Sequence, residues 1–342
     1  MIQQPKFWRK KAGAALLLLP LSLIWWTGSQ IRGIRARRFA QPARSSSNRP
    51  AIICVGNLTI GGTGKTPVVR LVVEMLQQSG WRPAILSRGY GGDLQGPVFV
   101  DKDYHTAREV GDEPLLLAGS APVCVSRDRA AGARYIAENS PADMPVDVIV
   151  MDDGLQNPYL DKDISIGVFD GQTGIGNGFL LPAGPLREPF ASGIKKLNIA
   201  IINGPDETGL SRRLPAHLPA LQAALHPENS KEDLPSGPFF AFAGIGRPER
   251  FFTSLQDAGL RLSETKAFGD HHLYSETELT ALAEAAARSH STLITTEKDW
   301  IRLPPEWRGH IVKYPVKLIL CEADHNYLSE TLNHQLRHVI SS

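Results

Sequence analysis

The stretch that decides the fold is AIICVGNLTIGGTGKTPVVRLVVEMLQQSG, residues 51–80. Its first part, AIICVGN, is almost continuously apolar, which is typical of a parallel strand buried on both faces. Residues 65–78 carry apolar side chains at helical spacing and are followed by a glycine, which predicts a helix. A glycine-rich turn that leaves a strand and opens a helix is the setting of a phosphate-binding loop. The stretch therefore predicts a nucleotide site in an α/β fold.

The loop departs at one position from the pattern G-x-x-x-x-G-K-[ST], because Thr59 stands where the first glycine is expected. Gly61 and Gly62 supply equivalent backbone freedom two residues later. We expect Lys65 to reach the terminal phosphates and the Thr66 hydroxyl to ligate magnesium. The alternative is a glycine-rich turn that binds no nucleotide. The predicted nucleotide-binding residues of the loop are Thr59, Ile60, Gly61, Gly62, Thr63, Gly64, Lys65 and Thr66.

A second apolar run, VDVIVMDD, ends in Asp152 and Asp153. P-loop proteins hold Mg²⁺ partly through an acidic residue at the end of a neighbouring strand. In isolation such a pair could equally form a turn, but the upstream loop favours the magnesium interpretation. The guanine-reading pattern of GTPases is not matched by TTEKD, since Lys298 and Asp299 are adjacent. ATP is therefore the favoured nucleotide.

The 342 residues carry a formal net charge of +2, which is too small to indicate a nucleic-acid-binding protein. Residues 12–26 form an apolar stretch that is shorter than the roughly 20 residues of a spanning helix and contains Pro20. The stretch predicts a shallow anchor on the cytoplasmic face of a membrane, with flanking basic residues against anionic headgroups. A secretory signal peptide is the alternative, but no small-x-small cleavage site follows. The arginines that follow the stretch are Arg32, Arg35, Arg37 and Arg38.

The three cysteines, Cys54, Cys124 and Cys321, show no C-x-x-C spacing, and their odd number argues against a disulfide framework. We expect them to be small buried apolar side chains in a reducing compartment.

Apolar runs alternate with helical patterns from residue 51 to residue 203, which predicts a mainly parallel sheet with helices on both faces. A linker is expected at 202–238, which is rich in Pro, Asn, Ser, Glu and Asp. Beyond it, further apolar runs, including HIVKYPVKLIL, and a final helix predict a second, smaller α/β unit. The expected division is an N-terminal membrane-anchoring helix at 1–38, a P-loop core domain at 39–235 and a smaller C-terminal α/β domain at 236–342.

Five further segments place polar residues where the strand-end loops of an open α/β sheet bind ligands. Each also has a purely structural explanation. Asp112 could cap a helix, His271 could lie in a solvated turn, and Lys298 could form a surface pair with its neighbour. The segments are SRGYGG (87–92), VGDEPLLLA (110–118), LPAGPLREP (181–189), FGDHHLYS (268–275) and TTEKDWIRL (295–303).

Behind the basic-flanked apolar N-terminus, the ordered motifs of the chain resemble those of the tetraacyldisaccharide 4′-kinase (lipid A 4′-kinase) family. The resemblance extends to about Leu303, and Asn157 departs from it, because the family usually has His there. It implies an enzyme at the cytoplasmic face of the inner membrane. This enzyme would transfer the γ-phosphate of ATP to the 4′-hydroxyl of a tetraacylated glucosamine disaccharide 1-phosphate in lipid A biosynthesis. The motifs are GNLTIGGTGKTP, SRGYGG, GDEP, DDGLQ, LPAGPLREP, DHH and TTEKD.

The resemblance also implies roles for individual residues. Lys65 and the loop amides would neutralise charge on the phosphates, and Arg187 would contact a phosphate. Asp112, paired with His271, would accept the proton of the acceptor hydroxyl. Neither an obligate protein partner nor nucleic acid is implied. Mg²⁺ would be held by Thr66, by one or both of Asp152 and Asp153, and by Glu188.

The runner-up is a membrane-associated P-loop ATPase or GTPase that works as a switch or maturation factor. A switch should hydrolyse nucleotide when its protein partner arrives, whereas a kinase should wait for an acceptor hydroxyl. A structural membrane protein with a vestigial loop is disfavoured, because Lys65, Thr66 and the acidic pair are all present.

Overall fold

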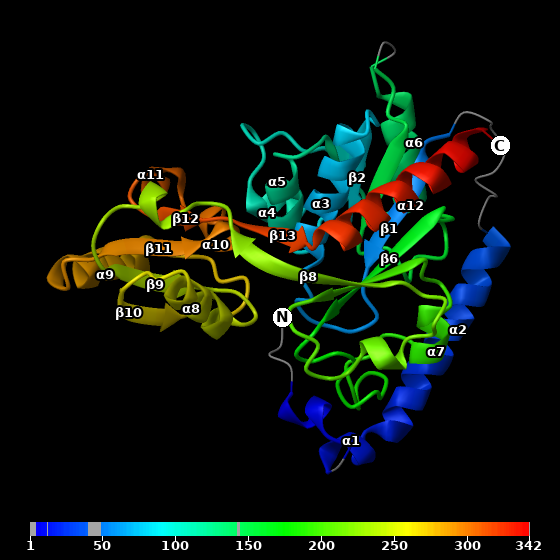
Figure 1. Cartoon of the computed structure of the whole chain (residues 1–342), viewed down its shortest axis with the longest axis horizontal. Helices are drawn as coiled ribbons and strands as arrows, with labels where there is room; N and C mark the ends of the chain where they lie inside the picture. Colours follow the sequence, from blue (N-terminus) through cyan, green and yellow to red (C-terminus); the bar gives the residue numbers. More distant parts are fainter. Residues whose placement is uncertain (1–4, 12, 40–48, 142–143, 342) are drawn as a thin grey trace.

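The computed structural model describes residues 5–11, 13–39, 49–141 and 144–341, which form two α/β units side by side (Figure 1). Ala12 of the predicted anchor lies outside the described residues. So do the side chains of Arg32, Arg35, Arg37 and Arg38.

The larger unit is built on one sheet. Its strands are β1 (Ala51–Gly56), β2 (Pro83–Ser87), β3 (Val98–Phe99), β4 (Val123–Val125), β5 (Val148–Asp152), β6 (Ile164–Asp170), β7 (Ile199–Asn203), β8 (Ala220–Pro227) and β13 (Val316–Leu320). Among the described residues their order is β13-β8-β7-β6-β1-β5-β2-β4-β3. All neighbours are parallel except the edge pairs β13–β8 and β3–β4. The predicted mainly parallel sheet is thus confirmed, with β1 near its centre.

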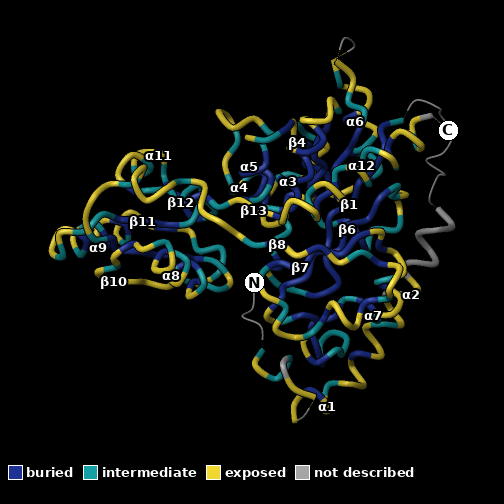
Figure 2. Tube along the Cα trace, viewed as in Figure 1, coloured by how far each residue is buried: buried dark blue, intermediate teal, exposed yellow. Residues whose placement is uncertain are grey.

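Helices cover both faces of this sheet (Figure 1). They are α3 (Lys65–Gln78), α4 (Ala107–Val110), α5 (Asp112–Leu117), α6 (Arg129–Glu138), α7 (Phe190–Ile194) and α12 (Glu322–Ser341). Successive residues of β1 pack on opposite faces of the sheet. Ile53 packs with buried residues of α3 and α12, whereas Ile52 packs with Ile136 of α6. Figure 2 shows the resulting buried centre of the unit. Because both faces are covered, β1 is apolar throughout.

The smaller unit has a parallel sheet in the order β10-β9-β11-β12 among the described residues. Its core combines aromatic residues of β9, such as Phe240 and Phe242, with Leu279 and Leu282 of α9. The strands are β9 (Phe239–Ala243), β10 (Leu262–Ala267), β11 (Thr292–Thr296) and β12 (Val312–Tyr314), and the helices are α8 (Pro248–Asp257), α9 (Glu276–Arg288), α10 (Glu297–Trp300) and α11 (Pro305–Arg308).

Two elements differ from the sequence prediction. The expected linker contains β8, which extends the large sheet, and two short 3₁₀ turns, Ser211–Arg213 and Lys231–Asp233. The run HIVKYPVKLIL forms two strands in different sheets, because Pro315 separates β12 from β13. β13 then pairs with β8, and α12 packs on the core of the larger unit. The last strand and helix of the expected 236–342 domain therefore belong to the larger unit, and the adjacent strands β8 and β13 connect it to the smaller unit.

The N-terminal segment follows the rim of the larger unit as a short 3₁₀ turn (Lys6–Arg9), α1 (Ala14–Leu17) and α2 (Leu19–Phe39) (Figure 1). Trp8 Nε1 donates to the Pro182 carbonyl at 2.9 Å, and Ser22 Oγ donates to the Leu180 carbonyl at 2.9 Å. Within the described residues, none of the helices combines the length and the apolar character needed to cross a bilayer.

The cysteines follow the prediction only in part. Cys54 in β1 and Cys124 in β4 are buried, whereas Cys321 is exposed between β13 and α12.

Candidate active site

The glycine-rich loop joins β1 to α3 in the way that the sequence predicts. Gly64 has a left-handed φ of 87° at the start of α3, and a Cβ there would lie 2.3 Å from Asn203 Nδ2. Asn203, at the end of β7, donates to the Thr63 carbonyl at 3.3 Å, while Asn57 donates to Thr63 Oγ1 at 3.2 Å. Only glycine fits at position 64, because a side chain would be strained and would displace the amide that holds the loop.

The first part of the loop is fixed by pairing with residues 185–187. Thr59 forms a β-bridge with Leu186, and the Ile60 N–H donates to the Pro185 carbonyl at 2.8 Å. Position 59 is thus in an extended pairing that a threonine tolerates, which accounts for the departure from the consensus glycine. The left-handed backbone is supplied instead by Gly61, with φ of 124°, and by Gly64.

Lys65 and Arg187 gather at one carboxylate. Lys65 Nζ lies 3.6 Å from Asp153 Oδ2, and Arg187 Nη1 lies 3.0 Å from Asp153 Oδ1. Two cations therefore share one anion at the mouth of the loop. Such an arrangement can accept a further anionic group, since a phosphate would be drawn to the excess of positive charge.

Asp152, at the end of β5, is buried beside this cluster, and its Oδ1 has no hydrogen-bond partner. Burial and the negative charge of Glu113 raise the pKa of Asp152, because they disfavour its ionised form. A buried carboxylate oxygen without a partner calls for a compensating cation.

Glu188 is engaged elsewhere. It pairs with Lys196 and accepts from Gln156 Nε2 at 3.1 Å. Over the described ranges, no three His, Cys, Asp or Glu side chains form a preassembled metal-ligand cluster. Of the predicted magnesium ligands, Asp152 and Asp153 therefore lie beside the loop. Asp153 and Glu188, however, form ion pairs with cationic side chains. Asn157, which departs from the family pattern, caps a local turn by accepting from the Tyr159 N–H at 2.9 Å.

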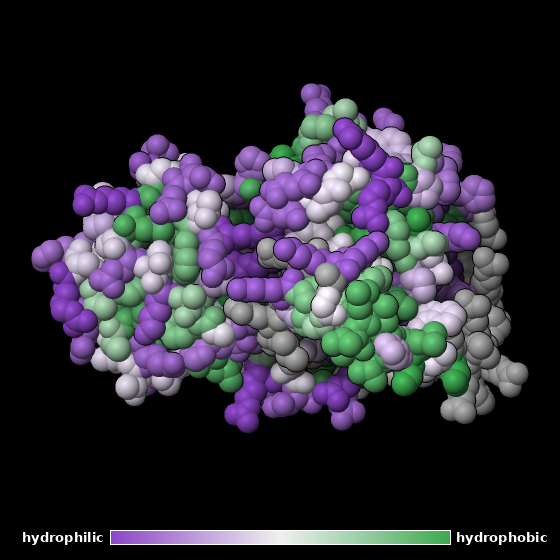
Figure 3. All heavy atoms as spheres, turned by 90° about the horizontal axis from the view of Figure 1, so that it is seen from below, coloured by the Kyte–Doolittle hydropathy of each residue, from purple (hydrophilic) through white to green (hydrophobic). Residues whose placement is uncertain are grey.

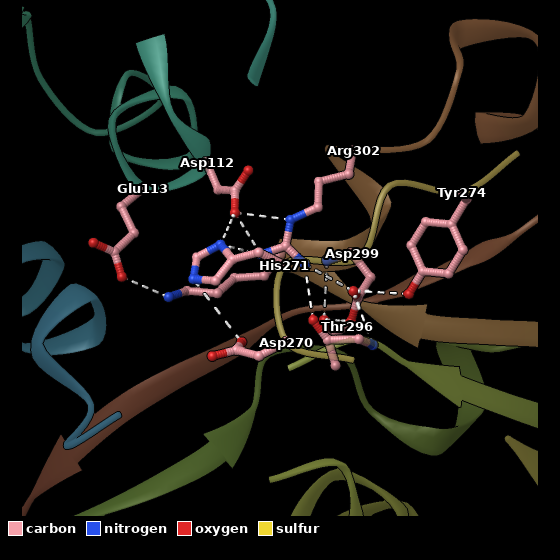
Figure 4. A network of polar contacts seen from close by, with 10 residues as sticks. Asp112, Glu113, Asp270, His271, Tyr274, Thr296, Asp299 and Arg302 are labelled. Carbon is pink, nitrogen blue, oxygen red and sulfur yellow. Dashed lines mark hydrogen bonds and ion pairs between the residues drawn. The ribbon is translucent and has the colours of Figure 1, made fainter. Parts of the chain in front are cut away.

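Asp112 opens α5 in the larger unit and meets two residues of the smaller unit (Figure 4). His271 Nδ1 lies 2.7 Å from Asp112 Oδ2, and Arg302 donates to the same oxygen through Nε at 2.8 Å and through Nη2. Burial alone would raise the pKa of Asp112, but the hydrogen bonds from His271 and Arg302 lower it to about 2. Asp112 is consequently a carboxylate at neutral pH.

Asp299 ties Arg302 to the rest of the smaller unit. Its side chain is fully buried, and Oδ1 accepts from Arg302 Nη1 at 3.0 Å and from the Tyr274 hydroxyl at 2.8 Å. The Gly244 N–H also donates to Oδ1, at 3.0 Å, and Thr296 Oγ1 donates to Oδ2 at 2.6 Å. Burial and the charge of Asp299 raise the pKa of Tyr274, so its hydroxyl remains a donor. The surface-pair explanation for Asp299 is wrong.

Lys298 pairs with Glu113 of the larger unit, Nζ to Oε1 at 2.7 Å. The charge of Lys298 is the main cause that lowers the pKa of Glu113, and Lys65 contributes in the same direction. Glu113 thus lies within electrostatic reach of both the phosphate-binding loop and the smaller unit.

The two units enclose a cleft of about 2630 Å³. The units also meet at Asp170, at the end of β6. Arg250 Nη1 lies 2.6 Å and Arg247 Nη1 lies 3.0 Å from its buried Oδ2. Residues that line the cleft include Trp25, Lys65, Thr66, Asp112, Asp152, Asp153, Arg187, His271, Lys298 and Arg302.

Sequence reasoning did not assign Glu113, Asp299 or Arg302 to the site. The structure links these three charged residues to it through their ion pairs. A signal for two of them was present in TTEKDWIRL, where Asp299 and Arg302 are three residues apart and so lie on one side of a helical turn. The sequence could not show that this turn faces Asp112.

Comparisons with known proteins agree on one family. A family model described as tetraacyldisaccharide-1-P 4′-kinase (LpxK) matches residues 14–337. The tetraacyldisaccharide 4′-kinase of Methylobacterium nodulans is 46% identical over 329 residues, which cover 94% of this chain and 93% of that protein. The protein of the same name from Rhodospirillum centenum is 42% identical over 329 residues, with 94% of each chain covered.

A solved structure agrees as well. The LpxK of Aquifex aeolicus, described as an "apo" form in complex with ATP, superposes with a TM-score of 0.74 at 25% identity. It covers 95% of this chain and 100% of that one. These findings favour a kinase over a nucleotide switch, and because they span most of the sequence, the chain belongs to the tetraacyldisaccharide-1-P 4′-kinase family.

Proposed function

We propose that the cleft transfers the γ-phosphate of ATP to the 4′-hydroxyl of a tetraacyldisaccharide 1-phosphate, with Asp112 as the proton acceptor. The observation that carries this assignment is the ionised Asp112 carboxylate, held by His271 and Arg302 in the same cleft as the phosphate-binding loop. A bond forms between the 4′-oxygen and the γ-phosphorus, and the bond to the β–γ bridging oxygen breaks. The hydroxyl proton passes to Asp112.

A carboxylate with a low pKa suits this reaction. The transition state of phosphoryl transfer is loose, so the acceptor oxygen needs orientation more than early deprotonation. Asp112 can accept a hydrogen bond from the hydroxyl at any physiological pH, because its pKa is held near 2. His271 would orient the carboxylate through Nδ1 and balance its charge.

The phosphates would be neutralised by Lys65, Arg187 and the loop amides at the N-terminus of α3. Both side chains now lie on Asp153, at 3.6 Å and 3.0 Å. Arg187 adds a planar fork that matches phosphate oxygens in two places.

The residues around Asp152 fit a magnesium ion. Its buried oxygen lacks a partner, carboxylate oxygens are preferred Mg²⁺ ligands, and Thr66 lies in the first turn of the adjacent helix α3. Thr66 and Asp152 would hold the ion, with Asp153 and Glu188 available if their cationic partners turn to the phosphates. When bound, Mg²⁺ would neutralise charge that develops on the β- and γ-phosphate oxygens.

The N-terminal segment would hold the enzyme against the inner membrane on its cytoplasmic face. Leu17 is 82% exposed, and Leu23 and Ile24 are 60% and 67% exposed. Figure 3 shows an apolar patch on the side of the molecule where α1 lies. Trp25 of α2 lines the cleft, so the same helix that carries exposed apolar residues reaches the site. Acyl chains could stay in the bilayer while the sugar enters the cleft.

The deciding experiment uses γ-labelled ATP, magnesium and detergent-solubilised full-length protein, with and without the tetraacyldisaccharide 1-phosphate. We expect label in the lipid, and we expect Lys65→Ala to abolish it. Lys195→Ala, which changes an exposed lysine outside the cleft, is the matched control and should transfer label normally. Label found only as free phosphate, whether or not lipid is present, would contradict the proposal.

A further inference from the structure

Arg302 connects the proposed proton acceptor to the most deeply buried carboxylate of the smaller unit. Arg302 lies just after α10 in the smaller unit, and its side chain is 1% exposed. Asp112 belongs to the larger unit. One edge of the guanidinium, Nε and Nη2, lies on Asp112 Oδ2. Nη1 donates to the Gly244 carbonyl and to Asp299 Oδ1, both at 3.0 Å. The planar group thus uses all three nitrogens at once.

The contacts leave the two oxygens of Asp112 unequal. His271 and Arg302 both reach Oδ2, and no described residue donates a hydrogen bond to Oδ1. Asp112 lines the cleft, and in Figure 4 the second oxygen points away from both partners. Oδ1 is therefore the oxygen that remains for an acceptor hydroxyl.

Arg302 is itself held in place. Asp299 is fully buried, and besides Arg302 it accepts from Tyr274, Thr296 and the Gly244 N–H. A carboxylate with four donors has little freedom to rotate, so its contact fixes the plane of the guanidinium. Arg302 also balances the charges of two buried carboxylates, which could not both ionise at low cost without it.

We propose that Arg302 is a positioning residue for phosphoryl transfer: it clamps Oδ2 of Asp112 against the rigid Asp299 and so presents Oδ1 to the acceptor hydroxyl. This inference rests on the proposed role of Asp112 as proton acceptor. A lysine could not replace Arg302, because an ammonium lacks the planar fork that contacts Asp112 and Asp299 simultaneously.

The charged groups around Asp112 come from three elements. His271, with Asp270 beside it, approaches from the loop after β10. Lys298 comes from α10, and Arg302 comes from the turn after it. The charges of Lys298 and Asp112 attract each other. Glu113 follows Asp112 on α5 and is neutralised by Lys298. Of these groups, only His271 and Arg302 touch the carboxylate, so loss of the Arg302 fork should leave Asp112 more basic.

The test compares steady-state kinetics of full-length Arg302→Lys with those of the wild-type protein, using ATP and the tetraacyldisaccharide 1-phosphate in detergent. We expect kcat to fall about 10- to 100-fold, as for loss of a hydrogen bond to a charged group, with KM for ATP nearly unchanged. The acid limb of the kcat–pH profile should also move to higher pH, which a purely structural defect would not produce. Wild-type kcat with an unshifted profile would overturn the inference.

Arg308→Lys is the matched control. Arg308 lies in the same unit and donates to the carbonyls of Leu303 and Ile301, which flank Arg302, but it does not touch Asp112. Its kcat should stay near the wild-type value. An equal loss of kcat in this control would mean that Arg302 acts only by bracing the turn, and the inference would fail.

A second variant covers the case in which Arg302→Lys does not fold, as judged by thermal unfolding and ATP binding. Asp299→Asn weakens the anchor of Arg302 but leaves its contact with Asp112, so kcat should fall by a smaller factor. Unchanged kcat in a folded Asp299→Asn would count against the clamp. Wild-type turnover by Asp112→Asn would instead refute the role of Asp112 as proton acceptor. This outcome distinguishes a failure of the proposed function from a failure of the proposed role of Arg302.

Discussion

The carboxylate of Asp112 lies 2.7 Å from His271 Nδ1, although 159 positions separate the two residues along the chain. Each unit supplies one of them, so the pair exists only while the units are docked. Other ion pairs cross the same boundary, among them Arg70–Glu297 and Lys298–Glu113, both at 2.7 Å. Movement of the smaller unit would therefore remove His271 and Arg302 from Asp112, the proposed proton acceptor.

We predict that Asp112→Asn separates nucleotide binding from transfer. The amide keeps the shape of the side chain but cannot accept the proton, so kcat should fall about 100-fold or more. ATP contacts lie at the loop and should keep their affinity, which equilibrium binding of ATP would show. His271→Gln, which retains the carboxylate and loses the imidazole, should give an intermediate kcat. An Asp112→Asn protein that binds ATP ten times more weakly would place Asp112 in nucleotide binding instead.

The low pKa of Asp112 also predicts how stability depends on pH. Its folded pKa of about 2 is below the unfolded value of 3.8. The resulting stabilisation is fully present above about pH 4 and is lost as the pH falls through 2. The shift corresponds to about 2 kcal/mol for this side chain, which is only 11% exposed. Urea unfolding of wild type and Asp112→Asn should give a constant difference in unfolding free energy between pH 7 and pH 5. That difference should shrink at pH 3, and a difference that grows on acidification would contradict the assignment.

The sequence predicted those parts of the molecule whose contacts are local or repeat along the chain. β1 and α3 were recognisable because burial on both faces makes β1 uniformly apolar and because Gly64 starts the helix. β8 was missed because it is partly exposed near the edge of the sheet, and its antiparallel partner β13 lies some ninety residues later, as in the pair Leu225–Leu318. Such pairing leaves no local pattern to read.

The same reason explains what was found and missed in the site. The glycine-rich loop and the acids after β5 belong to short motifs with known spacing. Arg302 reaches Asp112 across 190 positions, and its partner Asp299 is buried although charged residues are usually exposed. Only the three-dimensional arrangement shows that the two belong to the site.

We predict that Asp152→Asn stabilises the protein in the absence of magnesium and nucleotide. Burial raises the pKa of the Asp152 carboxyl, and its Oδ1 has no hydrogen-bond partner, so its negative charge is only partly compensated. Removing that charge should raise Tm by about 2–5 °C at neutral pH, while phosphoryl transfer is lost. Asp153→Asn is the control, because Asp153 is 30% exposed and neutralises Lys65 and Arg187. It should lower Tm or leave it unchanged. A drop in Tm for Asp152→Asn would show that the charge is already compensated.

Gly64→Ala should weaken both the fold of the loop and nucleotide binding. A left-handed φ costs a non-glycine residue about 1–2 kcal/mol, and the new Cβ would displace Asn203. Gly62→Ala is the matched control for stability, because its Cβ would meet no atom within 4 Å and its φ is not left-handed. Chemical denaturation should therefore give a lower free energy of unfolding for Gly64→Ala than for Gly62→Ala. Equal stabilities would show that Asn203 does not hold the loop through Thr63.

The membrane role of the N-terminal segment is best tested without deleting it. Trp8 and Ser22 hydrogen-bond to Pro182 and Leu180, and residues 185–187 that follow pair with the phosphate-binding loop. Truncation would therefore disturb the loop as well as the anchor.

We predict that the triple variant Leu17→Gln, Leu23→Gln and Ile24→Gln loses membrane affinity and raises KM for the lipid while KM for ATP stays constant. These side chains are exposed and make the apolar surface of α1 and α2, so the variant should leave the fold intact and remove the burial that draws the segment into the interface. Flotation with vesicles of phosphatidylglycerol and phosphatidylethanolamine measures the first effect, and kinetics in mixed micelles measure the second. Ile340→Gln, which changes an exposed apolar residue on α12, is the control. If the triple variant floats with the vesicles as well as this control does, the segment does not anchor the protein.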